Sequence, residues 1–142
     1  MKTLLVPVAM HDALPSVFET TRLAATRFGS LIEGVSLRPA LAEYVPVDMV
    51  GGMTWLRDEE ADRAEAEEAG GRFIAFMDGA GIPRHARDGL CIPDRVPDAG
   101  PRYRWRQDVP TGDAFLGQYA RLFSATVVGR PGTTDNAPPL PT

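Results

Sequence analysis

The sequence has few cysteines and histidines, the residues that disulfide bonds and metal sites require. Cys91 is its only cysteine, which excludes an internal disulfide and a cysteine-rich metal site and fits a reducing compartment. The two histidines, His11 and His85, have no metal-ligand spacing, so we expect no metal. No apolar run approaches the length of a membrane span, and the first residues lack the pattern of a signal peptide. These absences predict a cytoplasmic protein.

An excess of positive charge is also lacking. Lys and Arg number 15 against 19 Asp and Glu, and the formal net charge is -4. Proteins that bind nucleic acid usually carry a basic stripe, whereas here the basic residues are scattered, so we expect no nucleic-acid partner. What is present is 142 residues, of which 44% are hydrophobic. A chain of this size and composition can bury the core of one domain without crosslinks.

Apolar runs and helical stripes alternate along the chain. The patterns predict strands over 3–8, 31–37, 103–106 and 125–128, and helices over 15–28, 56–80 and 112–122. A strand, a helix and a second strand in so few residues require a crossover connection and parallel pairing. The order therefore predicts an α/β fold with a Rossmann-like, doubly wound parallel sheet, its first strand in the centre.

The helical stripes also predict which side chains are buried. The first helix should turn Val17, Thr20 or Thr21, Ala24 and Phe28 inward, and the last one Phe115, Leu116, Tyr119, Ala120 and Leu122. Gly70 and Gly71 interrupt the middle helix at a cost of about 1 kcal/mol each against alanine, which predicts a kink or close packing there. Tyr103 and Trp105 are interpreted as core residues.

Two long segments show no sustained period. Residues 38–55 contain scattered apolar side chains, and packing on the domain itself or contact with another subunit are equal alternatives for them. Residues 81–102 have the composition of an insertion, and 133–142 form a proline-rich tail.

The end of the last predicted strand carries a nucleotide-site pattern. The run 124–128 stops at Gly129-Arg-Pro-Gly132, and two glycines after a buried strand allow backbone N–H groups to approach a phosphate. The pattern alone has low specificity, because any sharp turn can use two glycines. In a doubly wound sheet, however, the winding reverses between the first and last strands, so the turn 9–12 and the turn 129–132 should share one crevice.

A family resemblance appears in the succession of these motifs. The segments Lys2-Thr-Leu-Leu-Val-Pro-Val8, Ala24-Ala-Thr-Arg-Phe-Gly29, Trp105-Arg, Gly112-Asp113, Tyr119-Ala-Arg-Leu and Ala125-Thr-Val-Val-Gly-Arg-Pro131 are similar to the universal stress protein (UspA-like) family. The similarity covers nearly the whole chain, in order. It is greatest to the N-terminal domain of the bacterial tandem form. The resemblance implies an adenine-nucleotide alpha hydrolase-like fold that often dimerises and, in one branch, binds ATP or AMP.

The resemblance also implies cofactor-binding positions, from which the chain departs in part. Gly129 and Gly132 match the first half of the family's phosphate motif, and the backbone of Val35 lies near the adenine position. An Asp is expected after the first strand, but Ala9 stands there, with Asp12 three residues later; the second half of the motif falls at Pro141-Thr142. The cofactor-binding candidates are therefore Ala9, Asp12, Val35, Gly129, Gly132 and Thr133.

The tail also departs from the family pattern, in which a further strand and helix follow. Residues 133–142 hold three prolines and no strand run, so we expect the exposed edge of the last strand to be covered by a second copy or by a second tandem domain. The chain 1–142 is interpreted as one universal stress protein-like domain, truncated or the N-terminal part of a tandem protein.

No catalytic constellation is apparent. His11 beside Asp12 is interpreted as a turn residue lining the crevice rather than an acid–base group, and Cys91 as a loop thiol. Ser124 lies in no nucleophile-elbow pattern. We therefore expect a non-enzymatic stress-response domain that acts through self-association, with an adenine nucleotide as the candidate small-molecule partner. The alternatives are a true ATP or AMP binder with slow hydrolysis and an enzyme of the wider nucleotide-handling α/β class.

Overall fold

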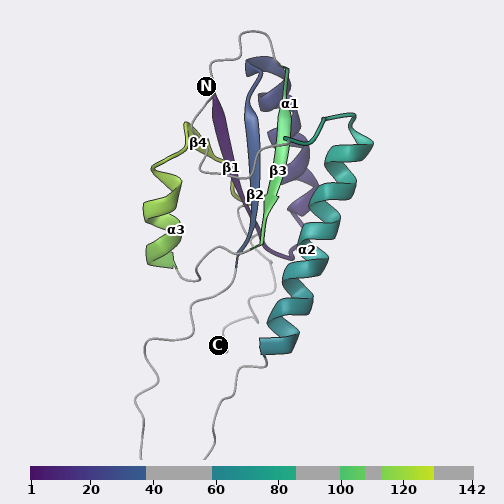
Figure 1. Cartoon of the computed structure of the whole chain (residues 1–142), viewed down its shortest axis with the longest axis vertical. Helices are drawn as coiled ribbons and strands as arrows, with labels where there is room; N and C mark the ends of the chain where they lie inside the picture. The colour runs from purple at the N-terminus through teal and green to yellow at the C-terminus, as the bar shows by residue number, and fades with distance from the viewer. Residues whose placement is uncertain (38–58, 86–99, 108–112, 130–142) are drawn as a thin grey trace, which may run out of the picture.

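The computed structural model of the chain describes residues 1–37, 59–85, 100–107 and 113–129 (Figure 1). Strands and helices alternate along them. In chain order they are β1 (Thr3–Val8), α1 (Leu14–Phe28), β2 (Leu31–Ser36), α2 (Glu59–Gly79), β3 (Arg102–Arg106), α3 (Asp113–Ala120) and β4 (Ala125–Thr126). The predicted element order is confirmed in these ranges, and the bounds differ by a few residues.

The four strands form one parallel sheet in the order β3-β2-β1-β4. β1 pairs with β2 from Thr3↔Leu31 to Val8↔Ser36, whereas it pairs with β4 only at Leu4↔Ala125 and Leu5↔Thr126. The predicted position of β1 between other strands is confirmed, as is its parallel pairing with the strand near the chain end. β4 is shorter than the predicted 125–128, because the ladder with β1 ends after Thr126.

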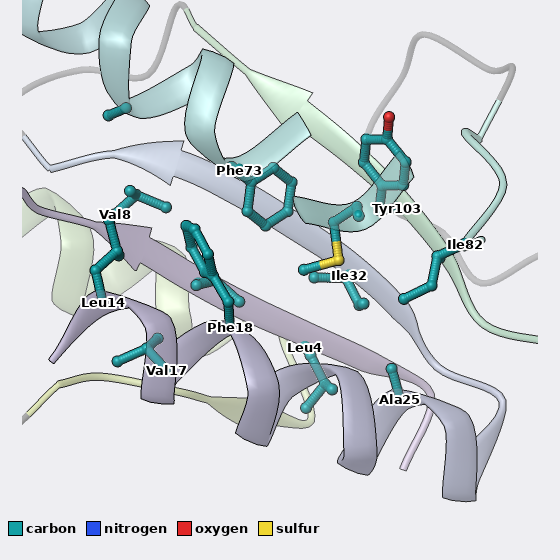
Figure 2. Close-up of a cluster of buried hydrophobic side chains, with 13 residues drawn as sticks. Leu4, Val8, Leu14, Val17, Phe18, Ala25, Ile32, Phe73, Ile82 and Tyr103 are labelled. Carbon is teal, nitrogen blue, oxygen red and sulfur yellow. The ribbon is translucent and has the colours of Figure 1, made fainter. Parts of the chain in front are cut away.

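Helices cover both faces of the sheet. Alternate side chains of a strand point to opposite faces, so Leu4, Val6 and Val8 face α1 and α2, whereas Leu5 faces α3. Figure 2 shows the larger core, in which side chains from α1 and α2 meet the sheet. Its buried members are Leu4, Val6, Val8, Leu14, Val17, Phe18, Ala25, Ile32, Ala69, Phe73, Met77, Ile82 and Tyr103. The architecture is thus a three-layer α/β arrangement (Figure 1).

Helix α1 follows most of its predicted pattern. It ends at Gly29, whose φ of 61° is left-handed and whose N–H donates to the Ala25 carbonyl, as predicted from a glycine in that place. Val17 and Thr21 are buried. The predicted inward orientation of Phe28 is wrong, since Phe28 is 52% exposed in the last turn.

The predicted inward orientation of Leu122 is wrong as well. Leu122 is 60% exposed, because α3 ends at Ala120 and the chain turns before β4.

Helix α2 approaches the sheet closely at a glycine. A Cβ built on Gly70 would lie 2.8 Å from Nε1 of Trp105, and one built on Gly34 of β2 would lie 2.8 Å from Cε3 of the same indole. Nothing lies within 4 Å of the corresponding position on Gly71. Close packing, one of the two outcomes predicted for this pair, is confirmed at Gly70. Tyr103 is a buried core residue, as predicted, and Trp105 is partly buried against the core.

Several predictions fall outside the described residues. They concern the segment 38–55, the greater part of 81–102, Cys91 and the tail 133–142. Among the helices that are described, none combines the length and the apolar character needed to cross a membrane.

Candidate functional site

The chain segments that follow β1 and β4 meet in space. β1 continues into the turn 9–12, and β4 continues to Gly129. A Cβ built on Gly129 would lie 2.7 Å from Nε2 of His11 and 3.1 Å from Cγ2 of Val17 in α1. A side chain at position 129 would therefore have to displace the His11 imidazole. The predicted approach of the two turns is present for the part of the second turn that is described.

His11 is held by the start of α1. Its Nδ1 accepts a hydrogen bond of 3.1 Å from the backbone N–H of Ala13, so in the neutral ring the proton is carried by Nε2, which lies toward Gly129. Ala13 is the N-cap residue of α1 and makes no side-chain capping bond. His11 and Asp12 are both exposed. The arrangement thus places the His11 imidazole beside Gly129 at the positive end of α1, and Asp12 is the next residue along the chain.

The other predicted site residues are placed as follows. Ala9 is partly buried directly after β1. Val35 lies near the carboxyl end of β2. Its side chain packs with Leu5 and Tyr119 in the smaller core, and its backbone is paired with β1 and β3. Gly132 and Thr133 lie outside the described residues. Within the part that is described, no group of three or more His, Cys, Asp or Glu could hold a metal ion.

Ser124 has a structural role at the start of β4. Its Oγ accepts a hydrogen bond of 3.1 Å from the backbone N–H of Lys2, and its own N–H donates to Oγ1 of Thr3 at 3.1 Å. Both bonds tie the start of β4 to the start of β1.

A second polar cluster lies under α3, and the sequence analysis did not find it. Glu33 of β2 is fully buried, with 0% of its surface exposed. Its carboxylate accepts hydrogen bonds from the guanidinium of Arg104 on β3, with which it forms an ion pair, and from the hydroxyl of Tyr119 on α3. We call Glu33, Arg104, Arg106 and Tyr119 the Glu33 cluster. Three elements meet at one buried carboxylate.

Arg106 completes the Glu33 cluster. Its Nη1 donates to the Tyr119 hydroxyl at 2.8 Å, and its Cζ lies 5.8 Å from the centre of the Tyr119 ring. The hydroxyl therefore accepts from a cation and donates to an anion. Burial, followed by the hydrogen bond to Glu33, raises the pKa of Tyr119, and Arg106 opposes that rise. The phenol is held in its protonated form, as a donor to the carboxylate.

A sequence signal for part of this cluster exists. In Arg102-Tyr-Arg-Trp-Arg106, arginines alternate with aromatic residues, and the strand period of two places all three arginines on one face. Tyr103 and Trp105 pack in the core under α2, so Arg104 and Arg106 face α3. A charged face on a strand of a covered sheet requires a buried counter-charge. Glu33, in a strand otherwise rich in apolar residues, is the candidate that this reasoning would have found.

The opposite face holds a comparable tyrosine, Tyr103, whose polar partners are exposed. The Tyr103 hydroxyl donates to the carboxylate of Asp78 and accepts from Nε of Arg84 at 2.7 Å. Burial raises the pKa of Tyr103, whereas the Tyr103 hydroxyl lowers the pKa of Asp78. Asp78 and Arg84 are more than half exposed, at 51% and 62% of their side chains. This cluster fastens the end of α2 to β3 at the surface.

The site region therefore has two parts: a junction of His11 and Gly129 at the carboxyl ends of β1 and β4, and the Glu33 cluster beneath α3. Comparison of the chain with protein-family models, with curated proteins and with solved structures finds no match, so its fold and these contacts are the observations that bear on its function.

Proposed function

We propose that the chain is a universal stress protein-like, non-enzymatic stress-response domain that acts through self-association along β4. The observation that carries this proposal is the state of the β4 edge. β4 pairs with β1 on one side. Two apolar residues that flank β4 in the sequence are exposed: Leu122 by 60% and Val128 by 64%. Edge strands with exposed apolar neighbours favour pairing with another chain.

Within the described residues, backbone groups of the other edge of the sheet are partly occupied. The segment after α2 lies along β3, where the N–H of Tyr103 donates to the carbonyl of Pro83 at 3.1 Å and the N–H of His85 donates to the carbonyl of Tyr103 at 2.7 Å. These bonds occupy backbone groups on the outer side of β3. Association through sheet edges is therefore directed to β4.

Sedimentation equilibrium tests the association. We expect the unmodified chain to form dimers, and Leu122→Asp combined with Val128→Asp to shift it to monomer, because two buried carboxylates would oppose an apolar interface. Leu23→Asp is the matched control, since Leu23 is 55% exposed on α1 and is not adjacent to β4 in sequence. A chain that stays monomeric at every concentration, or a control that dissociates as fully as the double variant, contradicts the proposal.

An adenine nucleotide at the junction of His11 and Gly129 is the second candidate. It is favoured by the meeting of the two turns at the carboxyl ends of β1 and β4, where doubly wound sheets bind ligands. It is opposed by Ala9, which supplies no carboxylate, and by His11, which fills the space beside Gly129. We therefore rank a true ATP or AMP binder with slow hydrolysis below self-association.

Equilibrium dialysis with labelled ATP separates the two candidates. We expect no saturable binding in the micromolar range by the unmodified chain. A simple Gly129→Ala variant is ambiguous, because the new methyl group collides with His11. The informative variant combines Gly129→Ala with His11→Ala, which removes the collision with the imidazole and leaves a close contact of 3.1 Å with Cγ2 of Val17. Micromolar binding that persists in His11→Ala and is lost in the double variant would make Gly129 a ligand-contacting residue and would reverse our ranking.

A further inference from the structure

We propose that α3 and β4 form a unit that can be released from the sheet, with the hydrogen bond between Tyr119 and Glu33 as its latch. This inference does not depend on the proposed function. It rests on how differently the elements are attached. β2 pairs with β1 from Thr3 to Val8 and with β3 from Leu31 to Val35, whereas β4 pairs with β1 at two positions.

The ladder between β4 and β1 extends little beyond the two paired positions. Beyond the two paired positions, the N–H of Ser124 donates to the carbonyl of Thr3 at 3.1 Å and the N–H of Val127 donates to the carbonyl of Leu5 at 2.9 Å. Ladder hydrogen bonds at an edge strand are the first to open in a native protein. β4 is thus attached by a short ladder, which the hydrogen bonds of Ser124 with Lys2 and Thr3 supplement, and it follows α3 directly along the chain.

Among the described side chains of α3, Tyr119 is the one that is buried. Tyr119 is 8% exposed, whereas Phe115, Leu116, Ala120 and Phe123 are only partly buried around it. The Tyr119 ring stacks on Phe115, with centroids 5.6 Å apart, and meets Phe123 edge-on at 5.2 Å. Its hydroxyl reaches across to Glu33 and Arg106, on β2 and β3. The packing of α3 on the sheet thus includes a polar contact, the hydrogen bond from the Tyr119 hydroxyl to the buried Glu33 carboxylate.

Release of the unit would change both parts of the site region. Gly129 follows β4 directly, so its contact with His11 would be lost together with the pairing of β4. Leu5 and Val35, which are 0% and 1% exposed beneath α3, would become accessible. Any ligand or partner that binds the closed arrangement would hold the unit shut by linkage, because it binds one of the two states better.

Native-state hydrogen exchange tests the latch. In Tyr119→Phe we expect amide exchange in residues 115–127 to become about tenfold faster or more, because a hydrogen bond to a buried charged group is lost. Exchange in β1 and β2 should change much less. Tyr103→Phe is the matched control, since it removes the corresponding hydroxyl on the other face and should leave residues 115–127 unchanged.

The unmodified chain supplies a second measurement, which does not require the variant to fold. At low denaturant, residues 115–127 should open with a smaller free energy than β1 and β2. The latch is excluded if these residues exchange together with β1 and β2, or if Tyr119→Phe accelerates exchange equally throughout the chain. An equal local effect of Tyr103→Phe would exclude it as well.

Discussion

Replacing Arg104 with methionine is expected to lower the free energy of unfolding by about 3–5 kcal/mol, because removal of one partner leaves a buried charge unpaired. The pair is deep in the fold: Glu33 is 0% exposed, and the Arg104 side chain is 11% exposed. Methionine retains most of the packing of the arginine stem, so the loss reports the charge rather than a cavity. Urea denaturation followed by circular dichroism measures it.

Two further variants establish the cause. Combining Arg104→Met with Glu33→Met should cost less than Arg104→Met alone, since buried ion pairs can be replaced by apolar residues of similar volume with little loss. Arg72→Met is the control, because its partner Glu68 is 55% exposed and a surface pair contributes at most about 1 kcal/mol. If Arg104→Met and Arg72→Met proved equally mild, the interpretation of Glu33 as a buried, arginine-dependent charge would be wrong.

Gly34→Ala is expected to destabilise the fold by about 3 kcal/mol, at the upper end of what overpacking a core usually costs. The added Cβ would lie 2.8 Å from Cε1 and Cζ of Phe73 and 2.8 Å from Cε3 of Trp105. Phe73 is 0% exposed and packs edge-on against Phe18 and Tyr103, so a shift of its ring would disturb both contacts. Thermal unfolding monitored by calorimetry would show the loss as a lower Tm.

Two glycines of α2 provide the matched comparison for that variant. Gly71→Ala should raise stability by up to about 1 kcal/mol, because alanine favours the helix and nothing lies near the new methyl group. Gly70→Ala should lower it, because the indole of Trp105 occupies that space. Equal Tm shifts in Gly70→Ala and Gly71→Ala would show that close packing on Trp105 is unimportant, and the expected cost of Gly34→Ala would lose its basis.

The arrangement of the sheet was largely accessible from local patterns. The run Thr3–Val8 lacks polar alternation, which indicates a strand covered on both faces, and the structure has it between β2 and β4. Helices between the strands require parallel pairing, which in turn brings the chain start beside Ala125. Gly29 was correctly predicted as the end of α1, because few other residues adopt its left-handed conformation easily.

The Glu33 cluster was not predicted, because its members are remote in sequence. Arg104 lies 71 residues from Glu33, and Tyr119 lies 86 residues from it. Their meeting depends on the register of β2 against β3 and on where α3 crosses the sheet. The exposure of Phe28 and Leu122 was missed for a related reason: an apolar stripe predicts a buried face, but the last turn of a helix and the residues beyond it can project past the layer they would cover.

Taken alone, the order of residues settled where strands and helices form and that the strands run parallel, since both follow from side-chain periodicity and from the length of the connections. Packing in three dimensions decided which glycine of α2 meets Trp105, that His11 fills the space beside Gly129, and that Glu33 is paired with Arg104. The physical reason is the distance along the sequence over which each effect acts. Periodicity acts within a single element, whereas each of these contacts is set by the register and separation of elements that the chain brings together from far apart.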